Sequence, residues 1–286
     1  MLKTIKKSLV RDLLPRRVSG SHKGQNGRVM IVGGSNMYHG APMLSALGAL
    51  HSGADLVFLF VPESNFEVCR SMYPDFIVQK FSGEFLSARD AGRIVEFGKK
   101  KADSILIGPG LGEREQTMDG VIEIVKNLNI PTVLDADAIN VLKKIEKFPL
   151  PQEIVVTPHQ NEFNNLVDRD MTIREGDTKS IILLRSVSMD LHLSVLFKGS
   201  KDFVSSYEGN VEVNTTGNAG MTVGGSGDVL AGLVASLMAQ GVESFDAARS
   251  AAYVNGLAGD LLRKQKGMNY SASDLAQMLA YAINKI

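Results

Sequence analysis

Short apolar runs rich in β-branched residues alternate along the chain with longer segments whose apolar residues recur at helical spacing. The runs predict strands at residues 28–33, 56–61, 104–107, 132–135, 154–157 and 194–197. The longer segments predict helices between them, among others at residues 41–53, 117–128 and 138–147. Because the strand runs are continuously apolar, we expect a mostly parallel central sheet with helices on both faces, which is a three-layer α/β/α sandwich.

The last third of the chain adds a hairpin and three helices to this pattern. Residues 203–206 and 211–214 flank the turn Tyr-Glu-Gly-Asn and predict a short hairpin. Helices are predicted at residues 229–240, 245–264 and 273–286. No low-complexity linker, repeat or charge block interrupts the chain, so we expect a single domain over residues 1–286. Its ligands should bind at the carboxyl ends of the parallel strands.

The N-terminal segment is basic and carries apolar residues at positions 2, 5, 9 and 13, a spacing that predicts an amphipathic helix. Such a helix either packs on the body of the domain or acts as a transit peptide. The acidic Asp12 and the lack of a Ser-rich stretch or a small-residue cleavage site favour packing.

Charge and composition narrow the range of partners. Lys+Arg 31 and Asp+Glu 31 give a formal net charge of zero, whereas nucleic-acid binders usually carry a basic excess. No uncharged apolar run approaches the roughly 18 residues that span a bilayer. We therefore expect neither a nucleic-acid nor a membrane partner. The single cysteine, Cys69, cannot form an intramolecular disulfide, which favours a reducing compartment and a cytoplasmic location.

A glycine-rich stretch at residues 214–228 is the strongest chemical signal. It ends in one carboxylate, Asp228, and leads directly into a predicted helix. Closely spaced glycines let backbone N–H groups surround an anion, and a helix N-terminus favours negative charge. Asp228 is then placed to act as a base toward a hydroxyl, although the helix start should lower its basicity. The alternative role for Asp228 is the helix N-cap.

The familiar phosphate-binding motifs are absent: no Gly-Lys-Ser/Thr closes a glycine run, and no GxGxxG follows the first strand. Six other motifs occur in order, namely RVMIVGGSNMYHGAP from residue 28, LIGPGLG from 106, VLDADAIN from 133, VVTPHQNEF from 155, VLFKGSKD from 195 and GGSGDVLAG from 224. Together they resemble the NAD(P)H-hydrate dehydratase family of the ribokinase-like superfamily, over residues from about 22 to about 241. Ser226 stands where the family more often has Thr, and Thr222-Val223 replaces a more usual Ala-Thr.

The resemblance implies roles for individual residues. Substrate contacts are implied for Ala41, Gly110, Gly112, His159 and Asp228. Contacts with the adenine nucleotide are implied for Lys198, Gly199, Ser200, Lys201, Asp202, Gly224, Gly225, Ser226 and Gly227. The carboxylate of Glu162 is expected to reach Mg²⁺ through water, since Mg²⁺ keeps much of its hydration shell.

The residues taken alone leave alternatives open at several of these positions. A lone histidine such as His159 is more often structural than ligand-binding. Asp135 and Asp137 lie at a strand end, where they can orient Mg²⁺, water or a hydroxyl, but Asp137 can also cap the helix that follows. A β-branched side chain at Gly225 is expected to disturb nucleotide binding more than the fold.

The reaction that the resemblance implies is the ADP- or ATP-dependent dehydration of the S epimer of hydrated NADH or NADPH (NADHX or NADPHX), a metabolite-repair lyase reaction. The substrate hydroxyl would be phosphorylated with Asp228 as the base, and phosphate would then be eliminated. Mg²⁺ is the implied cofactor. The family also implies a homo-oligomer, and an epimerase would be a separate chain.

Two other functions are compatible with the glycine-rich stretch. A vitamin-precursor kinase of the same superfamily shares it but generally lacks the joint set YHGAP, GPGLG and PHQNEF. A nucleotide-binding regulator without catalytic activity has no need of a base at Asp228.

Overall fold

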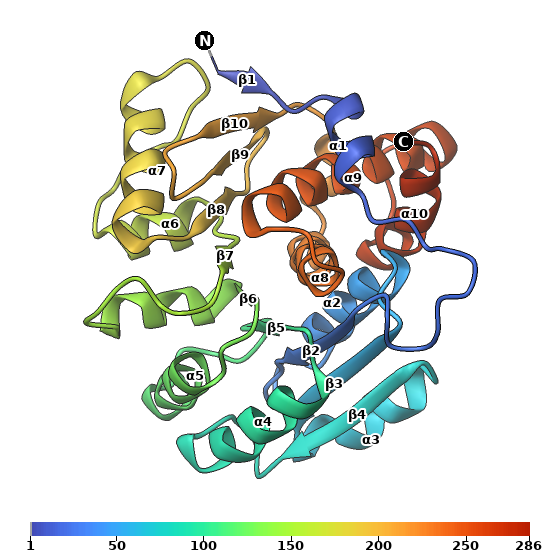
Figure 1. Cartoon of the computed structure of the whole chain (residues 1–286), viewed down its shortest axis with the longest axis vertical. Coiled ribbons are helices and arrows are strands. Elements are labelled where there is room, and N and C mark those ends of the chain that lie inside the picture. The colour runs from blue at the N-terminus through green and yellow to red at the C-terminus, as the bar shows by residue number, and fades with distance from the viewer. Residues whose placement is uncertain (1) are drawn as a thin grey trace.

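The computed structural model describes residues 2–286, and one ten-stranded sheet runs through it with strand order β1-β10-β9-β8-β7-β6-β5-β2-β3-β4 (Figure 1). Only β9 pairs antiparallel with its two neighbours, and all other pairs are parallel. The strands are β1 (Lys3–Thr4), β2 (Arg28–Val32), β3 (Leu56–Pro62), β4 (Phe76–Phe81), β5 (Ser104–Ile107), β6 (Thr132–Leu134), β7 (Ile154–Val156), β8 (Ser194–Phe197), β9 (Asp202–Ser205) and β10 (Val211–Asn214).

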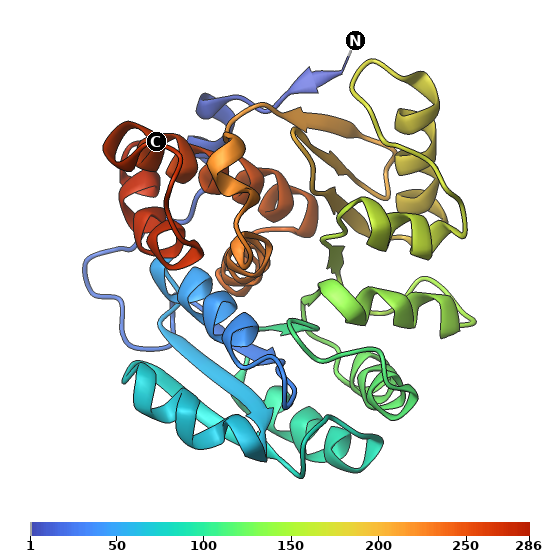
Figure 2. The ribbon, with the colours of Figure 1, turned by 180° about the vertical axis from the view of Figure 1, so that it is seen from behind.

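Helices cover both faces of this sheet (Figures 1 and 2). One apolar core joins the sheet to α1 (Lys7–Leu13), α2 (Gly40–His51), α3 (Glu63–Met72), α8 (Ser226–Ala239), α9 (Ser244–Lys266) and α10 (Ala272–Asn284). A second core joins it to α4 (Ala88–Lys101), α5 (Glu115–Asn127), the 3₁₀ helix η1 (Ala136–Lys144), α6 (Gln160–Val167) and α7 (Thr178–Leu191). A short 3₁₀ helix, η2 (Ala219–Thr222), lies in the glycine-rich stretch.

The two cores explain the continuous apolar runs. Along β2, Val29 and Ile31 face the first core, whereas Met30 and Val32 face the second. Every residue of a central strand is therefore buried, and the alternation that would mark a strand with one solvent face is lost. The predicted α/β/α sandwich with a mostly parallel sheet is confirmed.

The six predicted apolar strands are all present, but two strands of the sheet escaped prediction. β4 lies at the outer edge, where only its first and last residues are buried, so its sequence is mixed rather than apolar. β1 has only two residues, Lys3 and Thr4, and pairs with β10 at the opposite edge. The predicted helix at 138–147 is the 3₁₀ helix η1.

The N-terminal segment corrects one expectation. Lys3 and Thr4 form β1 instead of part of a helix, and α1 begins only at Lys7. The residue of α1 that is fully buried is Val10, which lay outside the predicted apolar face. α1 packs against α9, in agreement with the packing interpretation.

Helix α8 is the central element of the first core, and every residue from Val229 to Ala239 is buried. It crosses α2 at very short range. A Cβ atom on Gly232 would lie 1.9 Å from the carbonyl oxygen of Ser45, and one on Gly48 would lie 2.3 Å from that of Val229. The two glycines therefore let the helix backbones touch. This contact fixes the position of α8 relative to α2. Although α8 is so apolar, no helix within residues 2–286 has the length and hydrophobicity needed to cross a membrane.

This crossing gives a stability prediction. Gly232→Ala should destabilise the fold by about 3 kcal/mol, because the added methyl group must separate two backbones. The matched control is Gly92→Ala in α4, where a Cβ would meet no atom within 4 Å. That variant should be stabilised by about 0.4–1 kcal/mol through the loss of glycine flexibility in the unfolded chain. Denaturant unfolding measures both, and equal effects would contradict the assigned role of the crossing.

Candidate active site

The loops that follow the central strands meet at the carboxyl ends of those strands. The loop after β2 contacts the loop after β5, since the N–H of Gly34 donates to the carbonyl oxygen of Pro109 at 2.8 Å. A Cβ atom on Gly110 would lie 3.4 Å from the Cβ of Ala41. The structure thus brings together the two glycine-containing motifs that the sequence assigned to substrate.

A partly buried lysine connects the next three strand ends. Lys198, directly after β8, donates from Nζ to Oδ1 of Asp135 at 2.8 Å and lies 3.8 Å from Oε2 of Glu162. Thr157 Oγ1 donates to the same oxygen of Asp135 at 2.6 Å. Sequence reasoning missed this cluster. Its only signal was that each of these polar residues follows a buried strand, and the sequence does not say which strands are neighbours.

The ammonium group of Lys198 carries its charge inside the protein. Burial lowers the pKa of Lys198, but the carboxylates of Asp135 and Glu162, with a smaller effect of Asp228, raise it by more, so the net shift is upward. Burial also raises the pKa of Glu162, with Asp135 acting in the same direction and Lys198 opposing it.

Asp228 is the third residue of α8 and not its N-cap, which is Gly225 with φ 96°. Its carboxylate has no hydrogen-bond partner in the part of the chain from residue 2 to 286. Burial, followed by repulsion from Asp135, raises the pKa of Asp228 to about 7, and Lys198 only partly opposes this shift. The expectation of a lowered basicity is therefore wrong, because burial and the neighbouring carboxylates raise the pKa of Asp228. A carboxylate with this pKa can accept a proton near neutral pH.

Unpaired backbone donors surround the start of α8. Among residues 2–286, no acceptor faces the N–H groups of Gly224, Gly225, Gly227 and Asp228. Nζ of Lys198 would lie 3.2 Å from a Cβ atom on Gly227, so a cation stands beside these donors. Free N–H groups at a helix N-terminus next to an ammonium group form a site for a phosphate-like anion.

Comparison with known proteins identifies the family of this chain. A family model described as NAD(P)H-hydrate dehydratase matches residues 29–280. The chain belongs to the NAD(P)H-hydrate dehydratase family. It is 36% identical over 282 residues to an ADP-dependent (S)-NAD(P)H-hydrate dehydratase of Nitrosopumilus maritimus, covering 96% of this chain and 94% of that protein.

Two further matches concern the length of the relatives and the fold. The chain is 40% identical over 274 residues to a bifunctional NAD(P)H-hydrate repair enzyme of Methanothermobacter thermautotrophicus, covering 94% of this chain but only 52% of that relative. The chain therefore spans about half the length of the bifunctional relative. A Bacillus subtilis ADP/ATP-dependent NAD(P)H-hydrate dehydratase, co-crystallised with ATP/Mg²⁺, superposes with a TM-score of 0.86 at 24% identity, covering 99% and 98% of the two chains. This match confirms the predicted ribokinase-like fold.

The family motif PHQNEF contains a helix cap. Nδ1 of His159 accepts hydrogen bonds from the N–H groups of Asn161 at 3.1 Å and Glu162 at 3.2 Å, and Oε2 of Glu162 accepts from the N–H of His159 at 2.7 Å. This reciprocal capping box begins α6. Nε2 of His159 then carries the ring proton and lies 3.3 Å from Oε1 of Glu162. Because the imidazole remains 52% exposed, its outer edge can still touch a ligand.

The residues of the segment from Lys198 to Asp202 lie in different surroundings. Lys198 turns inward to the carboxylates, whereas Gly199 and Ser200 lie exposed in a turn. Lys201 pairs with Glu175. Asp202 accepts hydrogen bonds from the N–H of Gly199 at 3.3 Å and from Nδ2 of Asn214 at 3.1 Å, and burial raises the pKa of Asp202 to about 6. The ends of the segment thus shape the turn, and its exposed middle is accessible to a nucleotide.

The motif VLDADAIN is held in a strained conformation. Ala136, between the two aspartates, has φ 50°, which is unfavourable for a residue with a Cβ atom. Asp137 accepts a hydrogen bond from the N–H of Gly112 at 2.9 Å instead of capping the helix. The backbone donor of Gly112 is therefore already engaged, and Asp137 joins two loops of the site.

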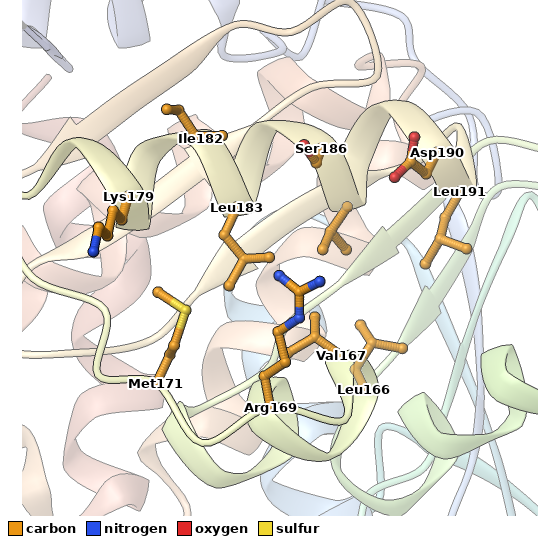
Figure 3. Close-up of a pocket in the computed structure, with 11 residues that line it drawn as sticks. Leu166, Val167, Arg169, Met171, Lys179, Ile182, Leu183, Ser186, Asp190 and Leu191 are labelled. Atoms are coloured by element: carbon orange, nitrogen blue, oxygen red, sulfur yellow. The ribbon is translucent and has the colours of Figure 1, made fainter.

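A separate pocket of about 600 Å³ lies between α6 and α7 (Figure 3). Its walls are mainly apolar side chains, among them Leu166 and Leu183, and Arg169 extends between the two helices. None of the predicted site residues lines this pocket, so we place the active site at the strand ends.

The capping box yields a prediction that separates two roles of His159. His159→Ala should destabilise the fold by about 0.5–2 kcal/mol, because two N–H groups lose their acceptor. His159→Asn keeps a capping side chain and should remain near wild-type stability. If the imidazole also contacts substrate, both variants should show a higher KM. An unchanged KM in His159→Asn would show that His159 only caps α6 and does not contact substrate.

Proposed function

We propose that this protein is an ADP- or ATP-dependent (S)-NAD(P)H-hydrate dehydratase that returns hydrated NADH and NADPH to their active forms. The proposal rests chiefly on one observation, the unpaired carboxylate of Asp228 beside free N–H groups and the Lys198 ammonium. Membership of the family and the likeness to a named ADP-dependent dehydratase support the same reaction.

The first step is transfer of the terminal phosphoryl group of the nucleotide to the substrate hydroxyl. Asp228 accepts the hydroxyl proton, and the oxygen then attacks phosphorus while the bond to the leaving nucleotide breaks. The N–H groups of Gly224, Gly225 and Gly227 donate hydrogen bonds to the phosphoryl oxygens. Lys198 adds a positive charge on the same side, where charge builds up in the transition state.

The second step is elimination. A phosphate group leaves carbon far more easily than hydroxide does, because it carries its negative charge at a much lower pKa. The electron pair of the ring nitrogen expels phosphate, and loss of a proton from the neighbouring carbon restores the ring double bond. We assign the contacts with the ring to Ala41, Gly110, Gly112 and His159, which the fold gathers near the strand ends.

Magnesium suits the site only together with a nucleotide. No group of three or more His, Cys, Asp or Glu side chains within residues 2–286 could by itself hold a metal ion. Hydrated Mg²⁺ usually binds through one or two carboxylates plus substrate phosphates. We infer that Glu162 contacts it through water, and when bound the ion would neutralise charge on the phosphates. The relative solved with ATP/Mg²⁺ supports this inference.

The cellular setting follows from the same resemblance. We propose a cytoplasmic homo-oligomer that works together with an epimerase activity, which recovers the R epimer. Cys69 is a free, buried thiol, which is compatible with a reducing compartment.

The decisive experiment is incubation with NADHX and either ADP or ATP while the absorbance of reduced nicotinamide is followed. A dehydratase restores the absorbance and releases phosphate. A kinase would accumulate a phosphorylated product without recovery, and a regulator would do neither. Recovery with one nucleotide only would identify the phosphoryl donor.

Asp228→Asn should separate catalysis from stability. Turnover should fall by roughly 10²–10⁴-fold, because the amide cannot accept the proton. The folded pKa of about 7 exceeds the ordinary 3.8, so the stabilising contribution of Asp228 is complete below 3.8 and is lost as pH rises through about 7. Asn should thus gain stability over Asp with rising pH, by on the order of 1–4 kcal/mol above neutrality.

Activity assays and denaturant unfolding at acid and mildly alkaline pH measure the two effects of Asp228→Asn. Near-normal turnover in the folded variant would show that Asp228 is not the catalytic base. A stability difference that does not change with pH would show that the carboxylate is not buried in its charged form.

Two adjacent glycines should respond differently to valine. A Cβ on Gly224 meets no atom within 4 Å, whereas one on Gly225 would lie 2.3 Å from Cδ1 of Leu44 at a φ of 96°. Gly224→Val should fold normally and lose at least about tenfold in nucleotide affinity, a change of about 1.4 kcal/mol. Gly225→Val should in addition lose about 1–3 kcal/mol of stability, so its expected loss of nucleotide binding comes with a cost to the fold.

Calorimetric titration with ADP and thermal unfolding distinguish the two glycine variants. Wild-type affinity in folded Gly224→Val would show that phosphate does not bind at this turn.

A further inference from the structure

Two large apolar side chains stand exposed beside the substrate loops. Met37 is 76% exposed and Tyr38 is 52% exposed. Both lie in the turn between β2 and α2, just before Ala41. Exposed apolar side chains beside a site offer a surface on which a ligand can pack, provided that the backbone that carries them is well fixed.

The backbone of this turn is fixed by reciprocal hydrogen bonds. The N–H of Tyr38 donates to the carbonyl oxygen of Ser35 at 3.1 Å, and the N–H of Ser35 donates to that of Tyr38 at 3.2 Å. Nδ2 of Asn65, a residue of α3 that is only 5% exposed, also donates to the carbonyl oxygen of Ser35 at 2.8 Å. A buried amide from another element therefore anchors the turn.

Tyr38 is in turn pressed against the loop after β5. A Cβ on Gly110 would lie 2.8 Å from the Cβ of Tyr38 and 3.4 Å from that of Ala41. Gly110 has φ 71°, so glycine is required there both for its conformation and for the space that Tyr38 occupies. Tyr38, Gly110 and Ala41 thus border the same small region.

The tyrosine is available to a ligand. Its hydroxyl group has no hydrogen-bond partner within residues 2–286, and about half of the residue faces solvent. A tyrosine ring offers a large flat surface and loses little conformational entropy on binding, since only two side-chain torsions must be fixed. A hydrated nicotinamide has a flat amide and a mainly apolar ring of matching size.

We propose that Tyr38 is a specificity-determining residue whose ring packs against the hydrated nicotinamide, with Met37 covering the outer edge of that ring. This inference rests on the proposed function and extends it to a residue outside the predicted site. The anchored turn makes the contact surface rigid before substrate arrives, so binding orders little of the protein.

The test compares Tyr38→Ala and Tyr38→Phe with Tyr281→Ala, a matched control on α10 whose tyrosine is 46% exposed. KM and kcat are measured with NADHX, and the affinities for ADP and for intact NADH are measured by titration. Tyr38→Ala should raise KM and weaken NADH binding by about 10- to 50-fold, in proportion to a lost aromatic contact. Tyr38→Phe should stay within about threefold of wild type, and Tyr281→Ala should be unchanged.

Three results would overturn the proposal. Wild-type KM and NADH affinity in folded Tyr38→Ala would show that the ring makes no contact. An equal loss of ADP affinity would show that Tyr38 only supports the loops. If Tyr38→Phe loses as much NADH affinity as Tyr38→Ala, the contact is a hydrogen bond to the hydroxyl group and not packing of the ring. NADH titration needs no turnover, so it tests Tyr38 even if wild-type protein fails to dehydrate NADHX and the proposed function falls.

Discussion

The site depends on one partly buried cation surrounded by carboxylates. Lys198 is bonded to Asp135 and lies close to Glu162, and its pKa is also raised by Asp228. Three carboxylates around one ammonium group leave excess negative charge in a poorly solvated place. Burial, followed by repulsion from Asp135, raises the pKa of Asp228 to about 7. The burial and repulsion that make Asp228 basic are unfavourable for folding, and the site therefore has to be held by structure outside it.

That support comes from the two apolar cores and from the crossing of α8 with α2. The backbones of these helices touch at Gly48 and Gly232, so the N-terminus of α8 has a fixed position relative to the sheet. This position sets both Asp228 and the free N–H groups before a nucleotide binds. Preorganised donors need no rearrangement during the reaction, which is why a rigid core favours electrostatic catalysis.

Several residues that make structural contacts also lie at the candidate site. His159 caps α6 through its ring nitrogen while its outer edge stays exposed. Gly225 shapes the start of α8 by packing against Leu44, while the neighbouring Gly224 faces open space. Asp137 ties the loop after β5 to the loop after β6. A substitution at such a position can change stability and binding together, and only a matched pair of variants separates the two.

The sequence by itself determined the fold class, six central strands and the loops of the candidate site, because buried parallel strands require continuous apolar runs and phosphate loops require glycine. It did not reveal β1 or β4, since edge strands carry no such run. Nor did it show that Lys198 faces carboxylates, that His159 is a cap, or that the basicity of Asp228 is raised. Those properties depend on which strand ends are neighbours and how deeply each side chain is buried. Both are fixed only when distant segments pack, so the tertiary structure alone decided them.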